Sequence, residues 1–290
     1  MSEGELLVVA TPIGNLGDLS PRAAEVLGAA DLVCAEDTRH TGLMFRRLGI
    51  APHRLLSVHA HNERQRIPEV LKELSAGRRV ALVSDAGTPG VSDPGERLVR
   101  AAIDAGFTVT AVPGPSAVVA ALTVAGAGVG RFSFEGFLPR KGAERAGRLR
   151  EVAQSDRPVV VYESPQRLLA TLADLAERCG PQRRVAVCRE LTKLHEEVVR
   201  GTLADALSHF SETPPRGEIT VVVHPRPAVE AENDRPGDEQ LLAELEARIA
   251  SGSSRRDAVG AVAERHGLSR RVVYDLSVKG PTPKPARGHR

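Results

Sequence analysis

Clusters of carboxylate and hydroxyl side chains follow three apolar runs of this 290-residue chain, and their residue types could do chemistry. They are Ser84-Asp85, residues 36–40 (Glu-Asp-Thr-Arg-His) and residues 190–196 (Glu-Leu-Thr-Lys-Leu-His-Glu). Each apolar run is typical of a buried strand. In open α/β sheets ligands bind at the carboxyl ends of strands, because the loops diverge there. The pattern predicts a ligand site beside carboxylates, although residues 190–196 are also consistent with a salt-bridged turn.

The stretch 80–95 is the strongest of these signals. Val80 to Val83 is predicted to be a buried strand, and a helical pattern resumes at Glu96. Between them lie three glycines, two prolines and two aspartates. A strand-to-helix turn needs only about two to six residues, so a loop of this length is predicted to bind a ligand.

Several kinds of site are disfavoured. His59 and His61 are two apart on a strand end, so their side chains diverge, and no metal site is expected. Ser116 and Ser164 lack the G-x-S-x-G elbow of hydrolases. The chain has neither a dinucleotide-binding glycine fingerprint nor a phosphate-binding NTPase loop. A cofactor that carries adenosine and is bound by the backbone of tight loops, beside a carboxylate, suits the remaining pattern.

The first 125 residues alternate strand and helix patterns. This alternation predicts a parallel or mostly parallel sheet covered by helices on both faces. Loops that contain Gly or Pro, after strands ending near 10, 83, 112 and 137, are expected along one edge of it. Strands are predicted at 6–10, 32–35, 55–58, 80–83 and 109–112. Helices are predicted at 21–30 and 63–76, another begins at 96, and a fourth, capped by Ser116, reaches 125.

The second half has shorter connections between its strands, which predicts a mixed sheet. Its strands are expected at 132–137, 159–162, 185–188, 196–200 and 219–223. The glycine-rich segment 126–130 is taken as the boundary between the two sheets. The predicted domains are 1–125 and 126–225, both α/β, a linker 226–239, a helix-turn-helix-like module 240–280 and a basic tail 281–290.

Charge is concentrated at the C-terminal end. Residues 250–290 carry nine Lys/Arg against three Asp/Glu, so their net charge is +6, whereas the whole chain has +2. A basic helical module with helix-turn-helix spacing favours an RNA partner. The alternative is a helical appendage for dimer contacts followed by a basic tail.

Composition is that of an ordinary globular protein, with 41% hydrophobic and 26% charged residues. The three cysteines are widely spaced and form neither a disulfide framework nor a zinc pattern, which predicts a reducing cytoplasm. Cys34 and Cys188 lie inside apolar runs and are predicted to be core residues. No apolar run approaches the ~20 residues of a membrane span, and the first residues do not form a signal peptide pattern. No membrane partner is expected.

Short motifs in a fixed order resemble those of one family. They are Leu7–Asp18, Ala35–Arg39, Ser84–Gly90, Pro113–Ala117, Phe134–Pro139, Tyr162–Pro165, Arg189–Lys193, Glu196-Glu197 and Gly217–Thr220. The chain resembles the tetrapyrrole-methylase superfamily of S-adenosylmethionine enzymes, and within it the ribosomal RNA small subunit methyltransferase I family. The match covers roughly residues 5–224, and the helical C-terminal segment resembles the module that this family adds.

The resemblance implies a two-domain tetrapyrrole-methylase-like fold in which the cofactor, S-adenosyl-L-methionine, lies between the domains of a homodimer. It implies methylation of the ribose 2′-oxygen of cytidine 1402 in 16S rRNA, as free RNA or within the 30S ribosomal subunit. Carried over position by position, cofactor contacts fall on Pro12, Gly14, Asp85, Ala86, Gly87, Pro89, Ser116, Ala117, Phe137, Leu138, Tyr162 and Thr220.

The implied methyl transfer mainly requires that the enzyme align the ribose 2′-oxygen with the methyl group, because a sulfonium methyl is already reactive. A ribose hydroxyl is a weak acid, so a base would help, and Glu190 is the first candidate and Asp37 the second. Phosphate contacts are expected from Arg39 and Lys193, and further RNA contacts from Arg140, Lys141, Arg270 and Arg271.

Two other functions stay open. Tetrapyrrole-acting relatives usually have Gly-Asp-Pro where this chain has Ser84-Asp85-Ala86, which disfavours a tetrapyrrole precursor as substrate. A non-catalytic RNA-binding protein that keeps the cofactor fold is disfavoured by the intact loops at the strand ends.

Overall fold

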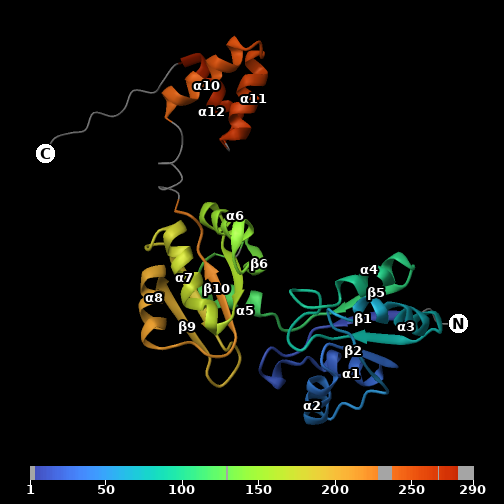
Figure 1. Ribbon diagram of the computed structural model, residues 1–290. Helices are drawn as coiled ribbons and strands as arrows, with labels where there is room; N and C mark the ends of the chain where they lie inside the picture. Colours follow the sequence, from blue (N-terminus) through green and yellow to red (C-terminus); the bar gives the residue numbers. More distant parts are fainter. Residues whose placement is uncertain (1–3, 129, 228–236, 267, 280–290) are drawn as a thin grey trace. The chain divides into compact units, whose positions relative to one another are not determined.

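The computed structural model describes residues 4–128, 130–227, 237–266 and 268–279. The chain divides into two compact units, Met1–Pro225 and Arg226–Arg290 (Figure 1). The first unit contains two five-stranded sheets and the second contains helices. The α/β fold with a parallel and a mixed sheet is therefore confirmed. Among the described residues no helix is long and apolar enough to cross a membrane.

The first sheet is parallel throughout, with strand order β3-β2-β4-β1-β5. Helices α1 and α2 pack on one face and α3 and α4 on the other, as Figure 1 shows. Its elements are β1 (Glu5–Val9), α1 (Pro21–Ala29), β2 (Leu32–Ala35), α2 (Thr38–Leu48), β3 (Leu55–Ser57), α3 (Glu63–Ser75), β4 (Arg79–Leu82), α4 (Glu96–Asp104) and β5 (Thr108–Val112), with a short 3₁₀ turn at Leu16–Asp18.

Local signals explain where these helices begin. The Ser20 hydroxyl accepts a hydrogen bond from the Ala23 N–H at 3.1 Å, and Pro21 occupies the first helical position, as predicted. Helix α2 was not predicted, because the polar residues 36–40 indicate a site and conceal the start of a helix. Asp37 caps α2, and Met44 and Phe45 on its inner face are buried.

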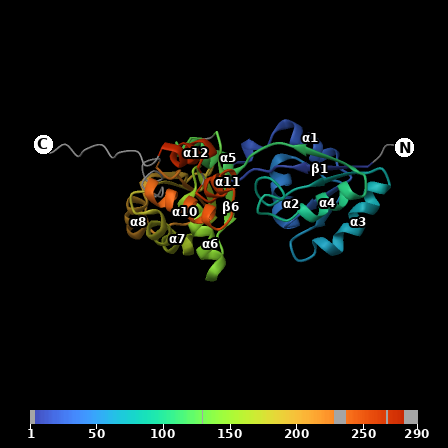
Figure 2. The same cartoon turned by 90° about the horizontal axis from the view of Figure 1, so that it is seen from above.

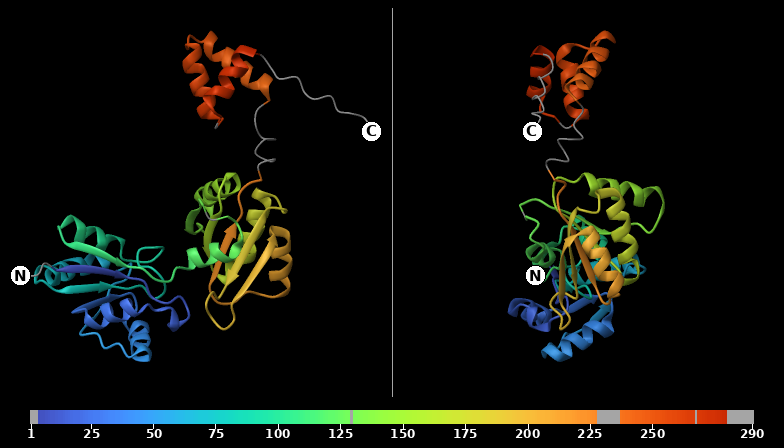
Figure 3. Two further views of the ribbon diagram at one scale, coloured as in Figure 1. Left: turned by 180° about the vertical axis from the view of Figure 1, so that it is seen from behind. Right: turned by 90° about the vertical axis from the view of Figure 1, so that its left-hand side faces the viewer.

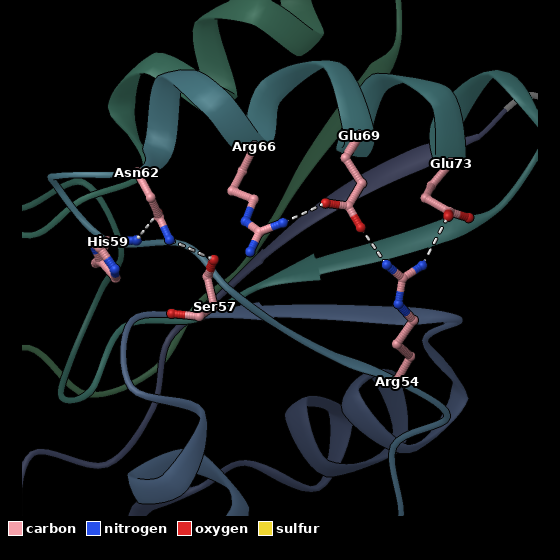
Figure 4. Close-up of polar contacts among 7 residues, drawn as sticks. All are labelled: Arg54, Ser57, His59, Asn62, Arg66, Glu69 and Glu73. Carbon is pink, nitrogen blue, oxygen red and sulfur yellow. Dashed lines mark hydrogen bonds and ion pairs between the residues drawn. The ribbon is translucent and has the colours of Figure 1, made fainter.

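A cluster of ion pairs joins β3 to α3 (Figure 4). Arg54 donates to Glu73 at 3.0 Å and also to Glu69, which accepts a further bond from Arg66 at 2.9 Å. Beside it, the Asn62 side chain accepts from the His59 N–H and donates to the Ser57 carbonyl, so it shapes the turn before α3.

We expect Arg54→Ala to destabilise the first unit by about 1 kcal/mol or less, although the ion pair connects two elements. The Arg54 side chain is 45% exposed, so solvent screens its attraction to the two glutamates. Thermal unfolding should show a shift of at most about 4 °C. A loss of more than about 10 °C would mean that the cluster contributes more than an exposed network can.

The second sheet has strand order β6-β7-β10-β8-β9, and β6 and β7 are its parallel pair. The other neighbours are antiparallel, so the predicted mixed sheet is confirmed. Helices α6, α7 and α8 cover one face. The elements are β6 (Ser133–Phe137), α6 (Gly142–Gln154), β7 (Val159–Glu163), α7 (Pro165–Cys179), β8 (Arg184–Arg189), β9 (Glu197–Thr202), α8 (Leu203–Glu212) and β10 (Ile219–Val223).

Helix α5 (Ala117–Ala125) covers the other face of this second sheet, opposite α6 to α8 (Figures 1 and 2). Its Ala121 and Leu122 pack with Val160 and Val222 of β7 and β10. The chain passes from one sheet to the other at 113–116, before α5, whereas the predicted domain boundary near residue 126 follows this helix (Figure 3). A uniformly apolar helix gives no sequence signal for which sheet it covers.

The predictions for the Ser116 cap and for the loop after Phe137 are wrong. The Ser116 hydroxyl makes no capping hydrogen bond to α5, although the helix does begin at Ala117. The loop after Phe137 belongs to the second sheet and not to the same edge as the loops after β1, β4 and β5. Cys34 and Cys188 are buried, as predicted, and Cys179 is buried as well.

The second unit contains α10 (Asp238–Ala250), α11 (Arg255–Arg265) and α12 (Arg270–Lys279). The three helices share a core that includes Leu241, Leu245, Val262 and Val273. Ser254 caps α11, and the Ser269 hydroxyl accepts from the Val272 N–H at the start of α12. The helix-turn-helix assignment stays a prediction, and the basic tail and most of the linker lie outside the described residues.

Candidate active site

The loops after β1, β4 and β5 are bonded to one another at the carboxyl edge of the first sheet. Thr11 and Gly87 exchange backbone hydrogen bonds of 2.8 and 3.0 Å. The Thr11 hydroxyl donates to the Ser84 carbonyl, and the Thr88 hydroxyl donates to the Pro115 carbonyl. Gly87 has a φ of +80°, which favours glycine there. The long central loop is thus held in one shape from both sides.

Two carboxylates anchor the same loop from neighbouring elements. Asp85 accepts a hydrogen bond from the Asp37 N–H at 3.0 Å. Glu63, at the start of α3, is buried and accepts from the Gly95 and Leu98 N–H groups at 3.1 and 3.0 Å. Because Glu63 satisfies free amides at the start of α4, it fixes the far end of the loop.

A cavity of about 330 Å³ lies in the first unit between these loops and the second sheet. This volume is at the lower end of the range for small-molecule sites, about 300–1,000 Å³. The first part of the chain contributes Ile13, residues 86–88 and 91–93, Ser116 and Ala117. The second part contributes Phe137, residues 162–165, Cys188, Leu191 and residues 217–220.

Seven of the twelve predicted cofactor residues line this cavity, namely Ala86, Gly87, Ser116, Ala117, Phe137, Tyr162 and Thr220. The other five, Pro12, Gly14, Asp85, Pro89 and Leu138, are not among the lining residues. Leu138 is instead buried in the core beneath α6 and α7. Gly14 contacts the opposite part of the unit, since a Cβ there would approach the Lys193 side chain to 2.4 Å. Asp85, Gly14 and Leu138 therefore make contacts around the cavity without lining it.

The charged groups that line the cavity are all acidic. They are Asp93, Glu163 and Glu218, and no Lys, Arg or His belongs to the lining. Burial, followed by the nearby Glu36 carboxylate, raises the pKa of Asp93 to about 6. Glu163 pairs with Arg167 and Glu218 with Lys193, so Asp93 is the lining carboxylate without an ion pair among the described residues. Its negative charge favours a cationic group over a phosphate in this cavity.

Aromatic and sulfur groups complete the lining. The Tyr162 ring makes edge contacts with Phe134 and Phe137, at centroid distances of 4.9 and 5.7 Å. Burial raises the pKa of Tyr162 to about 12 and that of Cys188 to about 11. Both groups therefore stay protonated at neutral pH, so a thiolate nucleophile is not part of this site.

The two predicted bases do not line the cavity. Glu190 accepts from the Lys193 ammonium at 2.7 Å and from the Glu218 N–H at 2.9 Å. Burial raises the pKa of Glu190, but these hydrogen bonds outweigh it and leave the pKa below its ordinary value. The hydrogen bond from Arg39 lowers the pKa of Asp37, the cap of α2, to about 2. Both groups are engaged as anions, which makes them weak proton acceptors.

Comparison with known proteins decides the family. The family profile described as Tetrapyrrole (Corrin/Porphyrin) Methylases matches residues 5–207. A protein of Synechocystis sp. named "Ribosomal RNA small subunit methyltransferase I" is 46% identical, over 95% of this chain and 98% of its own length. The protein of that name from Mycobacterium tuberculosis is 46% identical, over 99% of this chain and 100% of its own length. The one from Escherichia coli O157:H7 is 41% identical, over 96% of this chain and 96% of its own length. The chain belongs to the ribosomal RNA small subunit methyltransferase I family.

Solved structures share the tetrapyrrole-methylase fold of this family. The methyltransferase CobJ superposes with a TM-score of 0.59 at 25% identity, over 77% of this chain and 94% of its own. A uroporphyrin-III C-methyltransferase of Thermus thermophilus, solved in complex with S-adenosyl homocysteine, has a TM-score of 0.55 at 21% identity, over 76% and 96%. These likenesses support the fold of the two sheets.

In this family member, most of the predicted RNA-binding residues are exposed at the surface. The Arg39 side chain is 90% exposed and pairs with Asp37, while Lys193 joins Glu190 to Glu218. Arg140 and Lys141 are exposed before α6. Arg270 and Arg271 are exposed at the start of α12 in the second unit. Their role in RNA binding stays a prediction.

The sequence did not single out Asp93, a half-buried carboxylate that lines the cavity. It lies in the same loop as Asp85. The sequence favoured Asp85 as a site residue because Asp85 lies directly at the carboxyl end of the strand. Glu163 and Glu218 belong to motifs that were recognised, Tyr162–Pro165 and Gly217–Thr220, without being singled out. Among the residues that the structure describes, no group of three or more His, Cys, Asp or Glu side chains is arranged to hold a metal ion.

Proposed function

We propose that this protein transfers a methyl group from S-adenosyl-L-methionine to the ribose 2′-oxygen of cytidine 1402 in 16S rRNA. The observation that carries the proposal is a cavity, built on a methylase fold, whose charged groups are all carboxylates. A sulfonium cofactor is cationic at the reacting centre, so such a cavity attracts it. The close relatives are named for methylation of small-subunit ribosomal RNA, which supports the substrate class.

The residues present fit the cofactor. Ser116 and Ala117 begin α5, whose first turn has no side-chain cap, and both line the cavity. Free amides at a helix N-terminus bind a carboxylate, so they suit the methionine carboxylate. Glu218 also lines the cavity, and its carboxylate suits the cofactor's ammonium group. When bound, the cofactor supplies an activated methyl group.

The chain itself must hold the ribose hydroxyl in line with that methyl group and accept its proton. Asp93 is the best acceptor among the described residues, because it lines the cavity and burial raises its pKa to about 6. A base whose pKa lies near the operating pH combines an ionised population with adequate basicity. We therefore assign proton acceptance to Asp93 in place of Glu190 and Asp37.

The function is tested by incubating the purified protein with labelled S-adenosylmethionine and one of three substrates. These are 30S subunits that lack the modification, naked 16S rRNA and a porphyrinoid. We expect label in small-subunit RNA, resistant to alkali at a single ribose. Labelled porphyrinoid would instead indicate a tetrapyrrole methylase, and RNA binding without label would indicate a non-catalytic protein.

We further propose that the protein works as a homodimer in the cytoplasm, as its resemblance to the family implies. The cytoplasm is proposed because the proposed substrate, ribosomal RNA, is located there. Light scattering on the purified full-length chain should give twice the mass of 30.9 kDa. A monomer mass at micromolar concentration would contradict the dimer and leave the methylation assay unaffected.

A further inference from the structure

A second hollow adjoins the cavity in the first unit, and its charge is of opposite sign. Ser164, the residue before α7, lines both of them. Arg140, Arg145 and Arg167 line the hollow, with Asp174 as its acidic group. The lining thus changes from carboxylates on one side of Ser164 to guanidinium groups on the other.

Two of the arginines are held rigidly. Arg145 is 9% exposed, and its guanidinium donates to Asp174 at 2.8 Å, to the Pro139 carbonyl at 2.9 Å and to Thr171 at 3.1 Å. Arg167 donates to the Leu138 carbonyl at 2.8 Å and lies 3.4 Å from the Glu163 carboxylate. Their charges are largely balanced by Asp174 and Glu163, so they mainly shape the hollow.

Among the described residues, no carboxylate balances the positive charge of Arg140. It is exposed, and among the described residues its side chain has no hydrogen bond or ion pair. The Gln166 N–H, in the first turn of α7, also has no hydrogen-bond acceptor among the described residues. An exposed guanidinium beside a free helix-terminal amide is a good arrangement for a phosphate oxygen.

We propose that this hollow binds the RNA phosphodiester next to the ribose that is methylated, with Arg140 as its principal cation. The inference rests on the proposed function. The phosphate is attached to the sugar carbon beside the 2′-carbon, so it enters the site together with the reacting hydroxyl. The carboxylates of the cavity disfavour the negative phosphate, whereas the guanidinium groups of the neighbouring hollow attract it.

The test is Arg140→Glu in the full-length protein, assayed with 30S subunits that lack the modification. We expect KM for the subunit to rise at least about tenfold, since a charge-assisted contact is replaced by repulsion. The dissociation constant for S-adenosylmethionine should stay within about twofold. The slope of log(kcat/KM) against log salt should fall by about one, the value for one lost phosphate contact.

The matched control is Arg150→Glu, which makes the same charge change at an exposed position of α6 outside the hollow. It should change KM by less than about threefold, and Arg140→Lys should recover most of the loss. Equal effects of Arg140→Glu and Arg150→Glu would overturn the proposal, as would a weakened cofactor affinity in Arg140→Glu alone. Activity of the unsubstituted protein reports separately on the proposed function.

Discussion

Asp93→Asn should lower methyl transfer by about 10²- to 10⁴-fold at saturating cofactor and RNA, the usual contribution of a general base. The substitution keeps the shape of the side chain and removes its ability to accept a proton. The S-adenosylmethionine dissociation constant, measured by calorimetry, should change by less than about tenfold if the main role of Asp93 is in proton transfer. Rapid-quench turnover with 30S subunits gives the rate.

The pH dependence gives an independent measurement of the same role. Burial raises the pKa of Asp93 to about 6, so the carboxyl is protonated and inactive below that pH. The logarithm of kcat should therefore rise with a slope of one up to about pH 6 and level off above it. In Asp93→Asn this rise should disappear.

Glu190→Gln is the informative comparison, because Glu190 is the base that the sequence favoured. Its carboxylate is bonded to Lys193 and the Glu218 N–H, so we expect this change to lower stability more than kcat. If Glu190→Gln abolished turnover in folded protein while Asp93→Asn retained it, the assignment to Asp93 would be wrong.

Gly217→Ala should be among the most damaging small substitutions in the first unit. Gly217 has a φ of +78°, and a Cβ there would lie 2.2 Å from the Glu190 Oε1 atom. Glu190 would have to move and lose its bonds to Lys193 and the Glu218 N–H. We expect a loss of about 3 kcal/mol from backbone strain and broken hydrogen bonds, which calorimetry should record as a Tm lower by about 6–12 °C.

Gly49→Ala separates the two causes. Gly49, after α2, has a φ of +68° in the left-handed region, and a Cβ there would meet no atom within 4 Å. It therefore has the backbone strain without the steric clash, and should cost about 1–2 kcal/mol. Equal losses in both variants would show that Glu190 adapts freely. Gly217 also lines the cavity, so only Gly217→Ala should weaken cofactor binding as well.

Local sequence patterns determined much of the architecture of this protein. Apolar runs such as Val80–Val83 and Ile219–Val223 matched strands closely, because buried strands have few competing conformations. Ser20-Pro21 determined the start of α1. The length of the Gly- and Pro-containing loop after β4 predicted a ligand site there, and seven of the predicted cofactor residues line the cavity.

Tertiary structure decided which carboxylate faces the cavity. Asp85 and Asp93 belong to one loop, and their sequence neighbours do not tell which accepts a hydrogen bond from the backbone of another loop and which lines the cavity. Glu190 is held as an anion by Lys193 and by the Glu218 N–H, 28 residues away. Burial and partners over such separations set a pKa, and no local pattern contains them.

The path between the two sheets was also decided only by tertiary packing. Helix α5 is apolar on all sides, so its sequence was compatible with either sheet, and contacts with Val160 and Val222 place it on the second. That placement brings Ser116 and Ala117 to the cavity from the first half of the chain. The sequence alone determined most of the strands and helices, the loops and the family. Long-range packing and burial determined which carboxylates line the cavity and which arginines line the hollow beside it, because these residues are distant in the chain.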